Sequence, residues 1–145
     1  MRVVVDTNVA ASGLLWSGPP NQILKWTRRG GLEILACEET IAELSRVVRY
    51  KKFEKRLSIL GVSPAEVIAY YMNLVSFVPL PKAIPQLIVE DPFDNIFLAL
   101  ATGGSASLII SGDNHLLSLE EYEHIQIVTP GEACEVIQNL LGKRW

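Results

Sequence analysis

Cysteine is scarce in this chain of 145 residues, which contains only Cys37 and Cys134. Two cysteines cannot build a disulfide framework, and a structural zinc site would need further ligands, so we expect two buried thiols. No apolar stretch approaches the roughly 18 to 20 residues that cross a bilayer. The apolar start of the chain is already interrupted at Asp6. The sequence therefore predicts neither a membrane segment nor a secretory signal, and we expect a cytoplasmic protein.

Nucleotide-binding loops and the common hydrolase motifs are also missing. The chain has no G-x-x-x-x-G-K-[ST] loop and no G-x-G-x-x-G turn. His115 and His124 are too few and badly spaced for a zinc hydrolase, and neither Ser12 nor Ser17 stands in a G-x-S-x-G context. A phosphatase with an aspartate nucleophile generally has a second Asp two residues on, where this chain has Asn8. Acidic side chains remain as the main candidates for chemistry.

Composition indicates a compact chain with an uneven charge distribution. Hydrophobic residues make up 49% and charged residues 20%, which fits one domain over residues 1–145. The net charge is −3, yet residues 25–56 carry nine of the thirteen Lys and Arg residues, and residues 90–135 carry nine of the sixteen acids. This asymmetry reflects either two solvated faces of opposite sign or a basic approach surface beside an acidic metal site.

Hydrophobic periodicity predicts alternating strands and helices. Strands are expected at residues 2–5, 32–37, 76–78, 107–111 and 125–128. Helices are expected at about residues 19–29, 38–50, 53–60, 64–75, 94–102 and 130–141, with a loop at 12–20 and a proline-rich connection at 79–92. Because the strands are continuous apolar runs, we expect a parallel sheet with helices on both faces, which is an α/β fold.

Acidic residues follow two of the expected strands. Asp6 comes directly after the first strand, and Asp113 follows Ile110 by three residues. In open parallel sheets, ligands bind at the carboxyl ends of the strands. Either acid alone could merely begin a loop, but two acids on parallel strands favour a shared acidic pocket.

Two further carboxylates also have an ordinary structural explanation. Asp94 precedes an apolar helix, where Asp is favoured as the N-cap, and capping is compatible with metal binding through the second oxygen. Glu43 follows Glu39 by four residues, so the two could form a surface pair. Glu43 borders the buried stripe of its helix, however, and is better placed to point inward. Glu90 and Asp91 either support the site from outside or are simply exposed.

A cluster of these acids would require a cation. Carboxylates repel one another and stay ionised only beside a partner charge. No lysine lies next to any of the four candidates, which are Asp6, Glu43, Asp94 and Asp113. Mg²⁺ and Mn²⁺ prefer oxygen ligands, and such ions activate water and stabilise the leaving oxygen in phosphodiester cleavage. The acids therefore predict metal-dependent cleavage of a phosphodiester.

Four motifs in this order resemble those of PIN-domain proteins, over a span from Met1 to about Pro130. They are Val5-Asp6-Thr7-Asn8, Glu43-Leu44 with Val47-Val48, Asp91-Pro92-Phe93-Asp94 before Phe97-Leu98-Ala99-Leu100-Ala101, and Ile110-Ser111-Gly112-Asp113. Any one motif alone would be weak, but the ordered set is specific. Within that family the chain most resembles the VapC-like toxins of bacterial and archaeal toxin–antitoxin pairs.

The resemblance implies a three-layer α/β/α sandwich with a central parallel sheet, and endoribonuclease activity with Mg²⁺ or Mn²⁺. It implies metal-binding and catalytic roles for Asp6, Glu43, Asp94 and Asp113, and supporting roles for Thr7, Asn8 and Ser111. It also implies a homodimer that a cognate antitoxin holds inactive. His115 and Asn114 stand where relatives often carry another acid, which puts a second metal position in doubt. His115 is then either structural or involved in metal choice or substrate contact.

RNA as the substrate would require cationic contacts. We predict that part of the basic stretch contacts RNA phosphates, chiefly Arg46, Arg49, Lys51 and Lys52, with Lys55 and Arg56 nearby. Two alternatives stay open: a PIN nuclease for RNA processing or decay without an antitoxin, and a non-catalytic RNA-binding or scaffold domain. A neighbouring antitoxin gene would distinguish the first alternative from a toxin. A scaffold has no need to keep mutually repelling carboxylates together.

Overall fold

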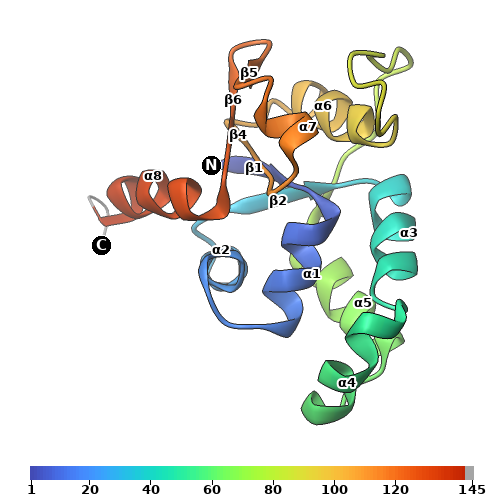
Figure 1. Ribbon diagram of the computed structural model, residues 1–145. Coiled ribbons are helices and arrows are strands. Elements are labelled where there is room, and N and C mark those ends of the chain that lie inside the picture. The colour runs from blue at the N-terminus through green and yellow to red at the C-terminus, as the bar shows by residue number, and fades with distance from the viewer. Residues whose placement is uncertain (143–145) are drawn as a thin grey trace.

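The computed structural model describes residues 1–142 of the chain (Figure 1). Its strands are β1 (Arg2–Val5), β2 (Glu33–Ala36), β3 (Ser76–Phe77), β4 (Leu108–Ile110), β5 (Glu121–Tyr122) and β6 (Ile125–Val128). Its helices are α1 (Thr7–Leu15), α2 (Pro19–Arg28), α3 (Glu38–Val47), α4 (Lys51–Leu60), α5 (Pro64–Leu74), α6 (Asp94–Gly103), α7 (Asn114–Leu117) and α8 (Pro130–Gly142).

The strands form one sheet in the order β3-β2-β1-β4-β6-β5. Neighbouring strands are parallel except β5, which runs antiparallel to β6. The valines of β1 alternate between two cores, since Val3 and Val5 face one core and Val4 faces the other. This burial on both faces explains why the strand is a continuous apolar run and confirms the predicted parallel sheet.

Helices cover both faces of the sheet and complete a three-layer arrangement (Figure 1). One core joins the sheet to α1, α2, α3, α4, α5 and α8. The other joins it to α6, to Leu116 of α7 and to Ile88 in the connection before α6. The predicted α/β sandwich is therefore confirmed.

Local signals set several helix ends as expected. Ser63 caps α5 by accepting a hydrogen bond from Glu66 N at 3.1 Å, while the Glu66 side chain accepts one from Ser63 N at 3.2 Å. This reciprocal pair satisfies two amide groups that lack partners within the helix. Gly61 ends α4 with a φ of 69°, a conformation that favours glycine. The predicted elements agree with the observed ranges to within three residues at each end.

Three elements were not predicted. The first is α1, whose last turn lies within the loop expected at residues 12–20. A Cβ at Gly13 would lie 2.8 Å from the backbone oxygen of Pro20, so this glycine permits close packing of α1 on α2 and does not break the helix. The second is the short α7. The third is β5, which pairs with β6 through Glu123 and His124 at φ values of 52° and 67°. Such turns usually contain Asn or Gly, so the sequence carried no sign of this hairpin.

The expectation of two buried thiols is right for one cysteine only. Cys37 is buried, whereas Cys134 on α8 is half-buried. No helix within residues 1–142 is both long and apolar enough to cross a lipid bilayer. The predicted domain extends to residue 145, and its last three residues lie outside the described range.

Candidate metal and nuclease site

Asp6 is held rigidly at the end of β1. Its backbone N–H continues the sheet by donating to Ile110 O at 3.0 Å, and its Oδ1 caps α1 by accepting from Val9 N at 2.8 Å. Its Oδ2 accepts hydrogen bonds from Ser111 Oγ and from Gly112 N. The side chain is buried, and this burial raises its pKa although the three hydrogen bonds act in the opposite direction.

Ser111 links Asp6 to the acid at the end of β4. Its buried hydroxyl donates to Asp6 and accepts from Asp113 N at 2.9 Å. Asp113 caps α7, since its Oδ1 accepts from His115 N at 2.8 Å. The register of the sheet pairs Val5 with Ile110, so the residues that follow the two strands must lie side by side. The predicted meeting of two strand-end acids is therefore a direct consequence of strand pairing.

Asp94 begins α6 with a buried carboxylate. Phe93 occupies the N-cap position and no side chain caps this helix, so the N-cap interpretation of Asp94 is wrong. Within residues 1–142, Oδ2 of Asp94 is buried without a hydrogen-bond partner. Burial, followed by the nearby carboxyls of Asp113 and Asp91, raises the pKa of Asp94 to about 8. A buried carboxylate oxygen without a partner lowers the stability of the folded state unless a proton or a cation binds to it.

Three carboxylates converge at this point. Carboxylate oxygens of Asp91, Asp94 and Asp113 all lie within 4.8 Å of one another. Asp6 and Glu43 are outside this trio but line the same cavity of about 240 Å³. Carboxylates this close cannot all ionise without a counter-charge. An all-oxygen donor set with an unsatisfied buried atom fits a hard divalent cation such as Mg²⁺ or Mn²⁺.

Glu43 reaches the cavity from α3 with a partner of its own. Its two carboxylate oxygens accept hydrogen bonds from the Arg46 guanidinium at 2.5 and 3.3 Å. Arg46 also donates to the hydroxyl of Tyr50. The candidate acids have no lysine next to them in sequence, but Glu43 does have a cationic partner one helical turn away. Glu43 would have to share or leave Arg46 to bind a metal ion.

The other predicted site residues are only partly gathered around the cavity. Thr7 and Asn8 line it from the start of α1, and Lys52 lines it from the start of α4. Arg49 instead donates to the backbone oxygen of Ser45 at 2.7 Å, and neither it nor Lys51 belongs to the cavity wall. Of the predicted phosphate-binding residues, Lys52 is therefore the one whose position favours substrate contact most directly.

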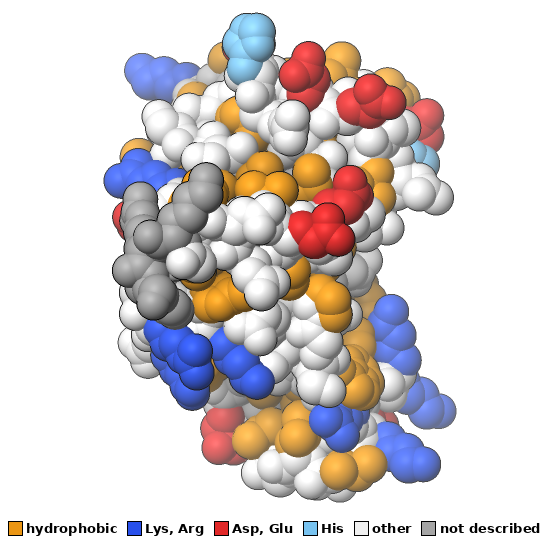
Figure 2. Space-filling view, turned by 90° about the vertical axis from the view of Figure 1, so that its left-hand side faces the viewer, with side chains coloured by type: hydrophobic (Ala, Val, Ile, Leu, Met, Phe, Trp, Pro, Cys, Tyr) orange, Lys and Arg blue, Asp and Glu red, His pale blue; other side chains and the backbone are white. Residues whose placement is uncertain are grey.

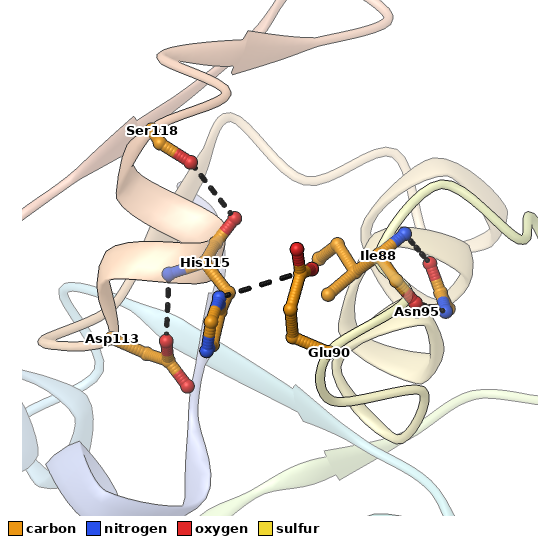
Figure 3. A network of polar contacts seen from close by, with 6 residues as sticks. All are labelled: Ile88, Glu90, Asn95, Asp113, His115 and Ser118. Atoms are coloured by element: carbon orange, nitrogen blue, oxygen red, sulfur yellow. Dashed lines mark hydrogen bonds and ion pairs between the residues drawn. The ribbon is translucent and has the colours of Figure 1, made fainter.

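Asn95, which was not among the predicted site residues, holds the segment that carries Asp91. Its side-chain oxygen accepts from Leu87 N and Ile88 N at 3.1 and 2.9 Å. Its amide nitrogen donates to Ile88 O and Pro92 O at 2.8 and 3.0 Å. Figure 3 shows the hydrogen bond between Ile88 N and the side chain of Asn95, near α7. The only sequence signal was a polar residue at the start of an otherwise apolar helix.

His115 faces the same connection. Its Nδ1 lies 4.0 Å from Glu90 Oε2, so the pair joins α7 to the segment before α6 (Figure 3). His115 is absent from the cavity wall, whereas Asp113, two residues earlier, is part of it. The sequence left the roles of Glu90 and Asp91 open. In the structure, Glu90 points to His115, while Asp91 joins the carboxylate trio.

Charge is unevenly distributed on the face of the molecule that Figure 2 shows. On the face drawn in Figure 2, most Lys and Arg side chains gather in the lower half, while Asp and Glu are more frequent in the upper half. Basic and acidic side chains, which are concentrated in different segments of the sequence, are therefore also separated on this face of the structure.

Comparison with known proteins identifies the family. The family model for the PIN domain matches residues 2–115, which is more than half of the chain and includes all five acids of the cavity. The chain therefore belongs to the PIN domain family, whose members are typically metal-dependent nucleases. No curated protein matched the chain.

Proposed function

We propose that this PIN-domain chain is a metal-dependent endoribonuclease that cleaves RNA phosphodiester bonds. The observation that supports this most is the buried Oδ2 of Asp94, which has no hydrogen-bond partner within residues 1–142 and lies beside two more carboxylates. A divalent cation at this position would supply the missing partner and the counter-charge together. A raised pKa in a cavity lined by other acids is typical of functional sites.

The proposed metal-binding and catalytic residues are Asp6, Glu43, Asp94 and Asp113, and the proximity of Asp91 adds it to the set. A bound Mg²⁺ or Mn²⁺ would activate water and stabilise the leaving oxygen. Asp6 contributes a carboxylate whose direction is fixed by three hydrogen bonds. Glu43 lines the cavity while paired with Arg46, so metal binding would require it to share or leave this guanidinium.

The supporting residues act on the position of these acids. Ser111 fixes Asp6 by donating a hydrogen bond to it, and Ser111 also binds the backbone of Asp113. Thr7 and Asn8 offer hydrogen-bonding groups at the wall of the cavity, where they can orient water or substrate. A small displacement of any ligand would weaken metal binding, so we assign positioning roles to all three.

RNA is the proposed substrate, and the basic stretch supplies its phosphate contacts. Lys52 stands at the cavity wall. Three more cations lie between α3 and the start of α4: Arg46 on α3, Arg49 just after it and Lys51 at the first position of α4. There they can reach the RNA strand outside the cavity. Clefts lined by charge raise the local concentration of substrate and steer its approach.

We further propose that the enzyme is the toxin of a toxin–antitoxin pair, that it acts in the cytoplasm and that it forms a homodimer. This proposal rests on the resemblance of its four ordered motifs to VapC-like toxins. Co-expression with the product of a neighbouring small gene should relieve growth arrest if the pair exists. A chain that cleaves RNA but leaves growth unaffected would instead be an RNA-processing or decay nuclease.

The proposal is tested by cleavage of single-stranded and structured RNAs with Mg²⁺, with Mn²⁺ and with a chelator. Asp6→Asn and Asp94→Asn should each abolish nearly all cleavage, because an amide keeps the shape of the side chain but loses its charge. Glu39→Gln is the matched control, since Glu39 is an exposed acid on α3 that lies outside the cavity wall. Cleavage that persists unchanged in chelator would overturn the metal mechanism.

A further inference from the structure

An exposed tryptophan with a guanidinium beside it lies at the far end of α1. Trp16 follows α1 directly and is 41% exposed. The guanidinium carbon of Arg56 lies 5.7 Å from the centre of its indole. Nε of Arg56 donates to Leu15 O at 2.7 Å, so the guanidinium is held in place at the ring. A planar cation held over an exposed aromatic ring extends the flat surface on which a base can stack.

This surface is connected to the carboxylate cavity by two short steps. Lys52 lines the cavity, and its Nζ lies 5.1 Å from the ring centre of Phe53. The Phe53 ring is in turn 5.9 Å from the indole of Trp16. Phe53 is buried, so Trp16 is the ring that the pair presents to solvent. Figure 1 shows α4 beside the end of α1 at the lower end of the molecule.

Neither cation on this path is neutralised by an acidic partner within the described residues. Within residues 1–142, no carboxylate lies within 4.0 Å of Lys52 or Arg56, whereas Arg46 is paired with Glu43. Proteins that bind single-stranded nucleic acid combine a cationic groove for the phosphates with aromatic rings on which bases stack. A protein partner would need apolar contact around Trp16, and the side chains that accompany Trp16 at the surface on this path, Lys52 and Arg56, are cationic.

We propose that Trp16 and Arg56 form a stacking platform for one unpaired RNA base, with the strand crossing Lys52 on its way to the carboxylate cavity. The platform deepens the ribonuclease function proposed above and rests on it. It selects for single-stranded RNA, because the bases of a duplex are already stacked and cannot lie on the indole. Trp16 is thereby a specificity-determining residue outside the wall of the acidic cavity.

The test measures RNA binding in the presence of chelator, so that cleavage does not interfere. Fluorescence anisotropy follows a labelled single-stranded oligonucleotide in which an abasic nucleotide is moved along the strand. One abasic position should weaken binding to the unaltered chain by about tenfold, which is the loss expected for one stacked base. Trp16→Leu should weaken binding to the intact strand by a similar factor. The abasic position should then cause no further loss in this variant, because both changes remove the same contact.

Matched variants separate stacking from folding and charge. Leu at residue 16 keeps an apolar cover over Phe53, and a thermal melt checks that the fold is intact. Trp26→Phe is the control, because Trp26 is a half-buried ring on α2, away from this path. Arg56→Gln should weaken binding to the intact strand and flatten its dependence on salt by about 0.7 for a lost phosphate contact.

The platform would be overturned by either of two results. Additive losses from Trp16→Leu and the abasic nucleotide would show that no base rests on the indole. If the Trp16→Leu variant binds RNA as the unaltered chain does but has a different sedimentation coefficient, Trp16 belongs to a protein interface. Both results leave the nuclease proposal standing if cleavage persists. An unaltered chain that binds RNA but does not cleave it would overturn the nuclease proposal, and the platform would then lose its role in substrate selection although the binding result itself would stand.

Discussion

At alkaline pH and without divalent metal, the Asp94→Asn variant should be more stable than the unaltered chain. Burial and the nearby Asp113 and Asp91 raise the pKa of Asp94 from 3.8 to about 8. The folded state therefore retains a proton that the unfolded chain has already released. Because the folded state then binds more protons than the unfolded state, stability falls as pH rises between these two values and is lowest above the folded pKa.

The size of this effect follows from the shift in pKa and from the setting of the carboxylate. Each unit of pKa difference corresponds to about 1.4 kcal/mol. Water at the open side of the cavity screens part of the repulsion, so we expect a loss of about 2 to 3 kcal/mol at high pH, less than the full shift would give. Asn cannot ionise and avoids this loss. The variant should therefore melt about 5 to 10 °C higher for a domain of this size.

Thermal denaturation in chelator, from about pH 4 to about pH 9, measures the difference. The two chains should differ little at the acid end and diverge as pH rises. Added Mg²⁺ should then stabilise the unaltered chain and leave the variant unchanged, because ligand binding to the folded state raises stability. Glu39→Gln serves as the control for loss of an exposed acid. A variant that is less stable at high pH, or a difference that does not vary with pH, would refute the reasoning.

Three further predictions concern the metal, the substrate and the fold. Asp113→Asn should markedly weaken the apparent Mg²⁺ affinity in cleavage assays, whereas His115→Ala should leave the Mg²⁺ titration in place, because imidazole is a poor Mg²⁺ ligand; the reverse result would move the ligand to His115. Lys52→Gln should reduce the slope of log K for RNA binding against log salt concentration by about 0.7, the value for one lost phosphate contact. Lys51→Gln should reduce this slope less, because Lys51 is outside the cavity wall. Equal slopes for the two variants would contradict the contact assigned to Lys52. Gly13→Ala should lower the free energy of unfolding by about 1 to 3 kcal/mol in denaturant titrations, because the new Cβ would lie 2.8 Å from a backbone oxygen of α2; an unchanged midpoint would show that α1 and α2 can separate freely.

Most elements could be predicted because their determinants are local. The valine run of β1 is apolar and β-branched, and Ser63 with Glu66 forms a capping pair within one turn. Local pattern also placed Asp6 and Asp113 after parallel strands, and the general geometry of such sheets then brought them to one edge. Where local preference conflicted with tertiary packing, as at Gly13, the prediction was wrong.

The sequence by itself thus determined the layered α/β frame and the edge at which acids gather, because strand burial and strand ends are properties of short segments. Only the tertiary structure decided the partner of each acid. Asp91 joins Asp94 because Asn95 holds the preceding connection, and Glu43 pairs with Arg46 across a helical turn. Such partnerships depend on side-chain direction and on contacts between distant segments. The hydrophobic period of a helix or strand shows which face is buried, but it does not show which polar atoms meet there.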